Sequence, residues 1–435
     1  MKVLFVNTNE SYGGAARAAN RIMRGVQMHG VEVQMFVKNR SSQAKDVVTL
    51  SQFVPTNPFY KVCDWIASKI KNQWQHYKWR AYKNRDRITY LSDLRATYIH
   101  GALQKMDYDI LHLNWFNQRF LDINELKKVQ KPIVWTLHDS WAFCGICHYF
   151  INCEKYQTHC GACPLLKSDK ERDLSYELFD RKIKAYKDLD LHIVTPSKWL
   201  GECAKKSVIL GRFPVTVIPN CLDTDIFRPL TKVEILTIAE HQQNAVVSRV
   251  LREATEKRIA KPLILFGAMN AANDRIKGFA SLLSALQLLD TQVFEARLVV
   301  FGANAQELPM KFKNIDVTFV GYIHDSQLLT ALYNSADVMV VPSYSEVFGQ
   351  TASEAMSCGT PVVAFRCTGI QDVVEVGCGY LAEPYSSDDL AKGIQYCIEN
   401  NTNNVLGKTA REFVVKRFAI DVVAEQYKAL YESLV

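Results

Sequence analysis

The stretch VPSYSEVFGQTASEAMSCGTPVV, residues 341–363, passes from the end of an apolar strand through a loop into a helix. Glu346 lies in the loop, the helix is expected to begin near Gly349–Thr351, and Glu354 lies one turn inside it. The helix is rich in small and apolar residues and therefore suited to burial, and a buried carboxylate needs hydrogen-bond partners. Sugar or ribose hydroxyls are suitable partners, and the N–H groups at the helix start suit a phosphate.

Strand-length apolar runs alternate with helix-length periodic segments on both sides of this stretch. Strands are expected at 3–6, 31–37, 110–113, 133–137, 192–195 and 215–218, then at 263–266, 297–301, 317–320, 338–341 and 361–364. Helices are expected at 15–28, 197–206, 279–289, 327–334, 351–357, 388–400 and 419–434. The alternation predicts an α/β fold with two doubly wound, Rossmann-like sheets, each covered by helices on both faces.

The domain boundary is expected where prolines and polar residues interrupt this pattern, between Pro219 and Lys232. We expect an N-terminal Rossmann-like domain over 1–225 and a C-terminal domain over 226–415. A helix over 416–435 is expected to cross back to the first domain. Two such domains facing a central cleft would bind ligands outside the carboxyl ends of their strands.

Composition and charge exclude several classes of protein. The 435 residues are 48% hydrophobic and 22% charged, as in ordinary globular domains rather than disordered or collagen-like chains. No apolar run approaches the ~20 residues of a membrane-spanning helix, and the first apolar stretch is too short for a signal peptide. A reducing, cytoplasmic location is therefore expected. Residues 1–230 hold 34 Lys and Arg against 22 Asp and Glu, whereas 231–435 hold 18 against 23, which suggests domains with different partners.

Two strand ends in the first half carry further candidate ligand-binding residues. Gly13 and Gly14 follow the first strand, where small residues let the backbone approach an anion at a helix start; a plain tight turn is the alternative. His138 follows the strand at 133–137. Its imidazole is suited to orienting a hydroxyl or stabilising charge, and the alternative is a histidine satisfied by local backbone groups.

The chain resembles the retaining GT-B glycosyltransferases of family 4. The resemblance rests on the E-x7-E pair and on segments that match in order, namely Gly13-Gly14, Thr136-Leu137-His138, Thr195-Pro196-Ser197, residues 217–227 and Lys277-Gly278. It implies a GT-B fold and transfer of a sugar, with retention of configuration, from a nucleoside-diphosphate sugar to a saccharide acceptor in polysaccharide or cell-surface glycan synthesis. The second domain would hold the donor, and the first would hold the acceptor.

The resemblance also assigns roles to single residues. It implies that Glu346 contacts the donor sugar and that Glu354 binds the ribose. His138 is expected to be a further catalytic residue. Backbone groups that contact the donor are expected at Phe348, Gly349, Gln350 and Thr351, at Gly13 and Gly14, and near Tyr322.

The expected clamp on the donor diphosphate departs from the family pattern. Lys277 matches the family's lysine, but Ala268 follows Gly267 where the family has an arginine, so Arg275 is expected to supply the second charge. Positioned cations and helix starts stabilise a leaving diphosphate without a divalent metal. The D-x-D triplets at 107–109, 188–190 and 223–225 are therefore interpreted as non-catalytic.

A cysteine-rich insert follows His138 in the sequence. Five of the 12 cysteines lie within 144–163, spaced C-x2-C-x5-C-x6-C-x2-C, which is typical of metal ligands. A related subset of bacterial glycosyltransferases resembles this insert. Disulfides are the alternative, disfavoured in a reducing compartment. We expect a structural Zn²⁺ site formed by Cys147, Cys153, Cys160 and Cys163, with Cys144 as a spare or replacement ligand.

Residues 61–95 combine nine Lys and Arg with only three acids and carry interleaved aromatics, Trp65, Trp74, Tyr77, Trp79 and Tyr82. Cations and aromatics on one helical segment suit an anionic membrane surface. This predicts peripheral attachment to the inner membrane face and a lipid-linked saccharide acceptor. The alternative is a solvated helix whose tryptophans pack on the domain. No recognition motif supports nucleic acid as a partner.

Two other functions remain as alternatives. One is a different GT-B enzyme, such as a sugar-nucleotide epimerase, against which the E-x7-E pair argues. The other is a non-catalytic, zinc-stabilised protein recruited to membranes, which would have no need to keep His138, Lys277, Glu346 and Glu354 together.

Overall fold

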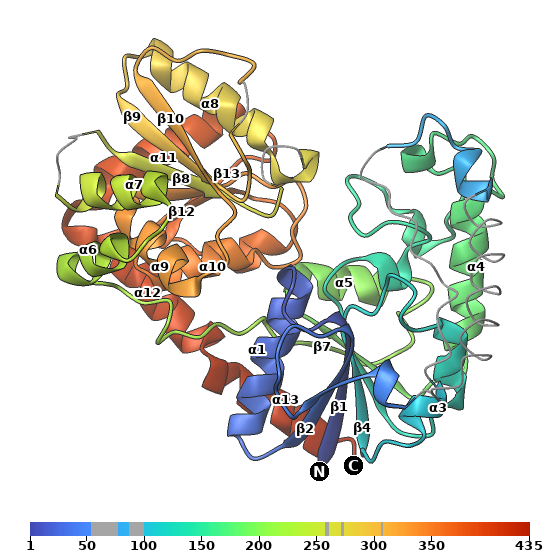
Figure 1. Cartoon of the computed structure of the whole chain (residues 1–435). Coiled ribbons are helices and arrows are strands. Elements are labelled where there is room, and N and C mark those ends of the chain that lie inside the picture. The colour runs from blue at the N-terminus through green and yellow to red at the C-terminus, as the bar shows by residue number, and fades with distance from the viewer. Residues whose placement is uncertain (54–76, 87–99, 257–260, 271–273, 306–307) are drawn as a thin grey trace. The chain divides into compact units, whose positions relative to one another are not determined.

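The computed structural model describes residues 1–53, 77–86, 100–256, 261–270, 274–305 and 308–435 (Figure 1). It contains two compact units, Met1–Ile218 with Ala424–Val435, and Pro219–Val423. The division falls after Ile218 rather than after residue 225, and the returning segment begins at Ala424 rather than at 416. Hydrogen bonding explains the earlier division, because the Leu222 N–H donates to the Phe418 carbonyl and so ties this segment to the second unit.

The first unit contains a parallel sheet, seven-stranded within the described ranges, in the order β3-β2-β1-β4-β5-β6-β7. Its strands are β1 (Lys2–Asn9), β2 (Glu32–Asn39), β3 (Val47–Thr49), β4 (Ile110–Leu113), β5 (Ile133–Thr136), β6 (Leu191–Thr195) and β7 (Val215–Val217). Its helices include α1 (Gly14–Met28), α3 (His100–Leu103), α4 (Leu174–Tyr186) and α5 (Lys198–Lys206). Strand order reverses beside β1, which pairs with both β2 and β4, and this is where such sheets bind ligands.

The second unit contains a parallel sheet, six-stranded in the part described, in the order β10-β9-β8-β11-β12-β13. Its strands are β8 (Leu263–Gly267), β9 (Ala296–Phe301), β10 (Ile315–Gly321), β11 (Val338–Val341), β12 (Val362–Phe365) and β13 (Gly379–Ala382). Its helices are α6 (Lys232–Glu240), α7 (Ala245–Thr255), α8 (Phe279–Thr291), α9 (Ser326–Ser335), α10 (Gln350–Ser357), α11 (Ser387–Asn400) and α12 (Val405–Phe418). Helix α13 (Ile420–Glu432) begins here and continues into the first unit.

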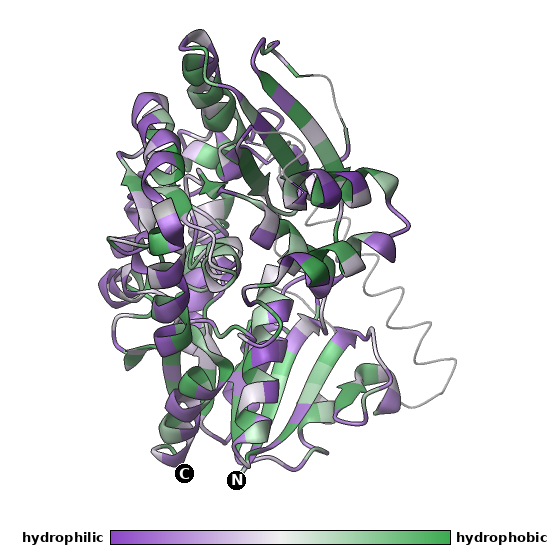
Figure 2. Ribbon diagram, turned by 90° about the vertical axis from the view of Figure 1, so that its left-hand side faces the viewer, coloured by the Kyte–Doolittle hydropathy of each residue, from purple (hydrophilic) through white to green (hydrophobic). Residues whose placement is uncertain are grey.

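Both faces of the second sheet are buried, as its sequence pattern predicts. Alternate residues of β8 belong to separate core clusters, Leu263 and Leu265 to one and Ile264 and Phe266 to the other. Such continuous apolar strands are typical of parallel sheets covered by helices. In Figure 2 the strands of each sheet are largely hydrophobic, and the helices beside them carry hydrophilic stretches. The predicted two-domain α/β fold is confirmed.

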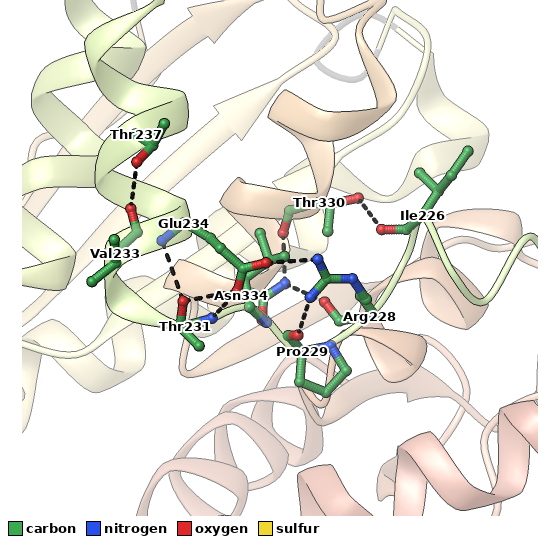
Figure 3. A network of polar contacts seen from close by, with 10 residues as sticks. Ile226, Arg228, Pro229, Thr231, Val233, Glu234, Thr237, Thr330 and Asn334 are labelled. Carbon is green, nitrogen blue, oxygen red and sulfur yellow. Dashed lines mark hydrogen bonds and ion pairs between the residues drawn. The ribbon is translucent and has the colours of Figure 1, made fainter.

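A polar network fastens the segment that enters the second unit (Figure 3). Arg228 pairs with Glu234 at 2.6 Å, and the other Glu234 oxygen accepts the Thr231 N–H in a capping box that starts α6. Asn334 of α9 donates to the Arg228 carbonyl at 2.9 Å, and Thr330 donates to the Ile226 carbonyl at 3.2 Å. These contacts hold residues 226–231, near the start of the second unit, against α6 and α9.

Candidate functional site

In the second unit, the turn after β8 and the loop after β11 bring Lys277 and Glu346 together. The Lys277 ammonium donates to Glu346 Oε1 at 2.6 Å, and each side chain is 16% exposed. The Ser343 hydroxyl donates to the same carboxylate oxygen at 3.1 Å. Since β8 and β11 are adjacent strands, this ion pair lies at the carboxyl edge of the sheet. Two residues predicted to act together are therefore in contact.

Glycine positions the turn that carries Lys277. Gly278 has a φ of +71°, and a Cβ there would meet the Pro342 carbonyl oxygen at 1.8 Å. The Tyr344 N–H also donates to the Ile276 carbonyl at 2.8 Å, so the short helical turn Arg275–Lys277 is bonded to the end of β11. Arg275 is exposed at the start of this turn. This close approach to Pro342 explains why glycine follows Lys277 in the sequence.

The backbone of Glu346 is held by Thr368. The Glu346 N–H donates to Thr368 Oγ1 at 3.0 Å, and the Gly369 N–H donates to the Glu346 carbonyl at 2.7 Å. Thr368 has a φ of +52°, an unusual conformation for a β-branched residue that concentrates at functional sites. No sequence pattern identified Thr368, because its contact is made across the sheet edge by the loop after β12.

Helix α10 carries the second glutamate. Glu354 is 2% exposed, and the Tyr333 hydroxyl donates to its Oε2 at 3.0 Å. The helix starts after Gly349, whose φ is +92° and whose Cβ would lie 2.2 Å from Ile370 Cδ1. Phe348 is buried against Phe418, so any contact it makes with a donor is through its backbone. Tyr333 was not predicted, since it lies on a different helix.

Other predicted donor residues occupy the same edge or the equivalent place in the first unit. Tyr322 follows β10 and is 48% exposed. Gln350 and Thr351 form the first residues of α10. Gly13 precedes Gly14 at the start of α1 with a φ of +96°, and the space around its missing Cβ is open, so its backbone conformation is what requires glycine. Donor binding by these residues stays a prediction.

In the first unit, His138 and Asp139 line a pocket after β5. The His138 Nε2 and the Asn114 Oδ1 are 2.9 Å apart, and three tryptophans, Trp115, Trp135 and Trp141, share the lining. Burial lowers the pKa of His138 to about 4, against a smaller opposing effect of the Asp139 charge. The imidazole is therefore neutral near pH 7. Its Nε2 hydrogen-bonds to the Asn114 side-chain amide rather than to a backbone group.

Asp139 connects this pocket to the cysteine-rich insert. Its carboxylate accepts the Trp115 Nε1–H at 2.8 Å and the Trp141 N–H at 2.8 Å, and its Oδ2 lies 2.6 Å from His148 Nδ1. Burial opposes ionisation of this carboxyl, yet the charge and hydrogen bond of His148 and the two other donors lower its pKa. His148 lies within the cysteine-rich insert, so its contact with Asp139 joins the insert to the pocket.

His112, a fully buried histidine, lies in β4, the strand that pairs with β5. His112 Nε2 is 2.8 Å from Thr136 Oγ1, and its Nδ1 is 2.6 Å from the Tyr431 hydroxyl. Tyr427 reaches the same Thr136 oxygen at 3.0 Å. The two tyrosines lie one turn apart on α13, so the C-terminal helix completes a hydrogen-bond network within the first unit.

The lowered pKa values of His112 and His138 predict that acid destabilises the first unit. Burial lowers the pKa of His112 to about 3, with a smaller contribution from His138. Since both folded-state pKa values lie below the ordinary 6.5, unfolding takes up protons below that pH. The stabilisation is complete above pH 6.5 and is lost as the pH falls towards 4 and 3.

Each histidine is expected to change the unfolding free energy by up to about 1.4 kcal/mol per pH unit in that window. Urea unfolding between pH 7.5 and 5, followed by tryptophan fluorescence, measures the slope. A His112→Gln variant is expected to be less stable with a shallower slope, whereas exposed His241→Gln serves as the control. An unfolding free energy independent of pH would contradict this assignment.

The expected zinc ligands do not form a metal-binding group in the structure. In the described part of the chain no three His, Cys, Asp or Glu side chains are arranged to hold an ion, and the cysteines there are free thiols. Cys144, Cys147 and Cys163 are buried, whereas Cys153 and Cys160 are partly exposed. His159 lies against the Tyr176 ring, 4.1 Å between centroids.

The basic, aromatic segment at 61–95 lies mostly outside the described residues, which include 77–86 of it. Within that window Trp79 is 8% exposed and has the Arg85 guanidinium 4.6 Å from its ring. The Tyr82 hydroxyl accepts the Leu174 N–H at 3.0 Å, and Tyr77 is exposed. For 77–86 these contacts favour the alternative of aromatics packed on the domain. Among the helices described, none has both the length and the apolarity to cross a membrane.

Comparison with known families gives two matches. Residues 12–226 match the model described as Glycosyltransferase Family 4, and residues 260–400 match the one described as Glycosyl transferases group 1. Together these matches include Gly13, His138, Lys277, Glu346 and Glu354.

Among curated proteins, one similar over most of its length is the putative colanic acid biosynthesis glycosyl transferase WcaC of Escherichia coli. It is 22% identical over 81% of this chain and 82% of its own. The sulfoquinovosyl transferase SQD2 of Arabidopsis thaliana is 33% identical, but over only 31% of this chain and 28% of that protein. The D-inositol 3-phosphate glycosyltransferase of Corynebacterium jeikeium is 36% identical over 24% of this chain and 26% of its own.

Solved structures with the same fold cover the whole chain. Sucrose-phosphate synthase from Thermosynechococcus elongatus superposes with a TM-score of 0.64 at 20% identity, covering 100% of this chain and 98% of that one. Anabaena HepE in complex with UDP-glucose superposes with a TM-score of 0.61 at 16% identity, covering 100% of both chains. At these identities the likeness establishes the fold alone.

Proposed function

Because the chain belongs to the group 1 and family 4 glycosyltransferases, we propose that it transfers a sugar from a nucleoside-diphosphate sugar to a saccharide hydroxyl with retention of configuration. The observation that carries the proposal is the Lys277–Glu346 ion pair, 2.6 Å long, which joins the turn after β8 to the loop that leads into α10 and Glu354. Two neighbouring segments at this sheet edge thus offer a cation and helix N–H groups for a diphosphate and two carboxylates for hydroxyls.

Each of these groups acts on a different part of the donor in the proposed reaction. As the glycosidic bond to the diphosphate breaks, negative charge grows on the phosphate oxygens and positive charge on the sugar carbon. In this proposal Lys277, with Arg275, stabilises the leaving diphosphate, and Glu346 binds the sugar. A bound donor diphosphate would share Lys277 with Glu346, because the two side chains are already in contact.

The acceptor is proposed to be a saccharide, lipid-linked and used at the cytoplasmic face of the membrane in glycan synthesis. The name of WcaC refers to colanic acid biosynthesis, which supports a polysaccharide pathway. The composition of residues 61–95 supports contact with an anionic membrane surface. Asn114 and His138, which line a small pocket after β5, offer polar groups for an acceptor hydroxyl.

The proposal is tested by donor binding. UDP-, GDP- and ADP-sugars are screened for thermal stabilisation of the purified chain, with UDP-glucose first because HepE was solved with it. One nucleotide class is expected to raise the melting temperature. Glu354→Ala is expected to weaken that nucleotide by about 10- to 100-fold, since hydrogen bonds to a charged group contribute roughly 1.5–3 kcal/mol.

The matched control is Glu412→Ala, an exposed carboxylate of α12, which is expected to keep full binding. Stabilisation by none of the three classes, or unchanged affinity in Glu354→Ala, would count against the assigned donor site.

A further inference from the structure

We propose that a cavity at the carboxyl edge of the first sheet binds the phosphate or diphosphate group of a saccharide acceptor. The proposal rests on the proposed function and names a part of the acceptor site. The cavity has a volume of about 340 Å³ and is lined by Lys38, Thr49, Leu50, Ser51 and Phe120. That volume lies within the range of roughly 300–1,000 Å³ that small-molecule sites occupy.

The cavity is formed at the ends of neighbouring strands. Lys38 is the penultimate residue of β2, and Thr49 ends β3 and is followed by the short helical turn Leu50–Gln52. Phe120 belongs to the loop after β4. Strand β1 lies between β2 and β4 in the sheet. The cavity therefore lies at the carboxyl edge beside the point where strand order reverses, which is where doubly wound sheets bind ligands.

The polar part of the lining suits an anion. The Lys38 ammonium donates to the Gln118 carbonyl, a contact that keeps its charge beside the loop after β4. The hydroxyls of Thr49 and Ser51 lie 2.8 Å apart on the opposite side. Among the described lining residues there is one cation and no carboxylate. Ammonium and hydroxyl groups are the side-chain donors that phosphate oxygens accept from, and the charged donor makes the stronger bond.

The apolar part of the lining is rigid. Phe120 is 2% exposed and packs against Phe36 of β2, with 5.3 Å between the ring centroids. Phe36 also contacts the Phe53 ring edge-on at 6.0 Å. Apolar walls with a few convergent polar groups are typical of sites for small molecules. The wall of Phe120 and Leu50 suits the carbon atoms of a sugar attached to the phosphate.

The turn that faces Lys38 has an unusual backbone. Gln118 and Arg119 are consecutive non-glycine residues with φ of +59° and +62°. Such conformations are costly and concentrate at ligand-binding and catalytic sites. The bond from Lys38 to the Gln118 carbonyl helps to hold this turn. The strained turn and the cation are thus parts of one arrangement.

The backbone that follows β2 is held as well. The Asn39 side chain donates to Asn9 Oδ1 at 2.7 Å. The buried Glu10 carboxylate accepts the N–H groups of Ser41 and Ser42 at 2.6 and 2.8 Å. These bonds fasten the end of β2 to the loop after β1, so the lysine of the cavity is carried by a fixed segment.

The loop after β4 connects this cavity with the pocket of His138. Asn114 lines that pocket and Phe120 lines the cavity. Six residues of chain span at most about 22 Å. A short saccharide is long enough to place its phosphate in the cavity and a hydroxyl beside His138. This proximity assigns the phosphate to the acceptor rather than to the donor, whose proposed residues Lys277 and Glu346 lie in the second unit.

Calorimetric titration of the full chain with inorganic pyrophosphate tests the cavity. The parent protein carries Lys277→Met, so that pyrophosphate does not bind through the proposed donor site. One binding site per chain is expected. Adding Lys38→Met is expected to weaken binding by about 10-fold, the usual effect of removing one charged hydrogen-bond donor. Lys45→Met, which removes an exposed lysine outside the cavity, is the matched control and is expected to keep the affinity.

A second variant tests the cavity without changing its charge. Ser51→Phe places a large side chain in the space and is expected to weaken pyrophosphate binding at least as much as Lys38→Met does. It also decides the matter if Lys38→Met fails to fold. Unchanged affinity in both variants, or no binding to the parent protein, would overturn the proposal.

Two further probes distinguish the source of the phosphate. A soluble sugar 1-phosphate represents a soluble acceptor, and a saccharide on a polyprenyl diphosphate in phosphatidylcholine vesicles represents a lipid-linked one. Binding of either probe that is weakened by Lys38→Met supports the cavity and identifies the source.

The donor screen fails or succeeds separately. A nucleotide that stabilises the chain, together with pyrophosphate binding that is insensitive to Lys38→Met, overturns the cavity alone. Pyrophosphate binding that depends on Lys38, without stabilisation by any nucleotide, counts against the proposed function instead.

Discussion

Replacing Glu346 by glutamine is expected to lower kcat/KM for sugar transfer by about 10²- to 10³-fold, the usual loss when one charge-stabilising group is removed from a preorganised site. Glutamine keeps the size of the side chain and can still accept from Ser343, but it cannot balance the Lys277 charge 2.6 Å away. Steady-state kinetics with the donor found by the thermal screen measures the effect. The loss is expected mainly in kcat, because the charge acts as the donor bond breaks.

Two variants make this result interpretable. Glu375→Gln removes an exposed carboxylate of the same unit and is expected to leave transfer unchanged. Lys277→Met is expected to impair transfer by a similar factor, and combining it with Glu346→Gln is expected to cost much less than the product of the two losses. Wild-type turnover in Glu346→Gln, or fully multiplicative effects in the double variant, would show that the pair does not act as a unit.

The strands could be predicted from sequence wherever they are long and buried on both faces. Every expected strand is present within one to three residues at each end, because runs such as 338–341 have no other stable place than the centre of a parallel sheet. The strands that were missed, β3 and β13, are edge strands of three and four residues. Edge strands depend on pairing with one neighbour rather than on a strong apolar pattern of their own.

The site could be predicted only in part, for a related reason. Glu346, Lys277 and Glu354 could be named because their segments resemble those of the family 4 glycosyltransferases. Their supporting partners could not: Tyr333 contacts Glu354 from another helix, and Thr368 contacts Glu346 from the next loop of the sheet. Such contacts form between residues far apart in the chain, so they leave no pattern in the local sequence.

The buried histidine network shows the same limit at greater sequence distance. Tyr431 and His112 are separated by 319 positions, and His112 stands in β4, an apolar central strand whose four residues are all buried. The returning helix was expected from periodicity, but its polar bonds to the sheet were not. Those bonds account for why the C-terminal residues belong to the first unit.

Replacing Tyr431 by alanine is accordingly expected to destabilise the first unit by about 3–5 kcal/mol, the usual cost of removing a large buried aromatic side chain. Tyr431 is 0% exposed, and its hydroxyl is 2.6 Å from His112 Nδ1. Tyr431→Phe keeps the ring but leaves that nitrogen unpaired, so a smaller loss of about 1–3 kcal/mol is expected.

The sequence supplies a selective probe for this test. All seven tryptophans lie between residues 65 and 199, so urea unfolding followed by tryptophan fluorescence reports on the first unit alone. Glu432→Ala, an exposed neighbour on α13, is expected to change the unfolding free energy by less than about 0.5 kcal/mol. Donor binding by the second unit is expected to survive Tyr431→Ala below the unfolding midpoint of the first. An unfolding midpoint for Tyr431→Ala equal to that of wild type would mean that α13 is not a structural part of the first unit.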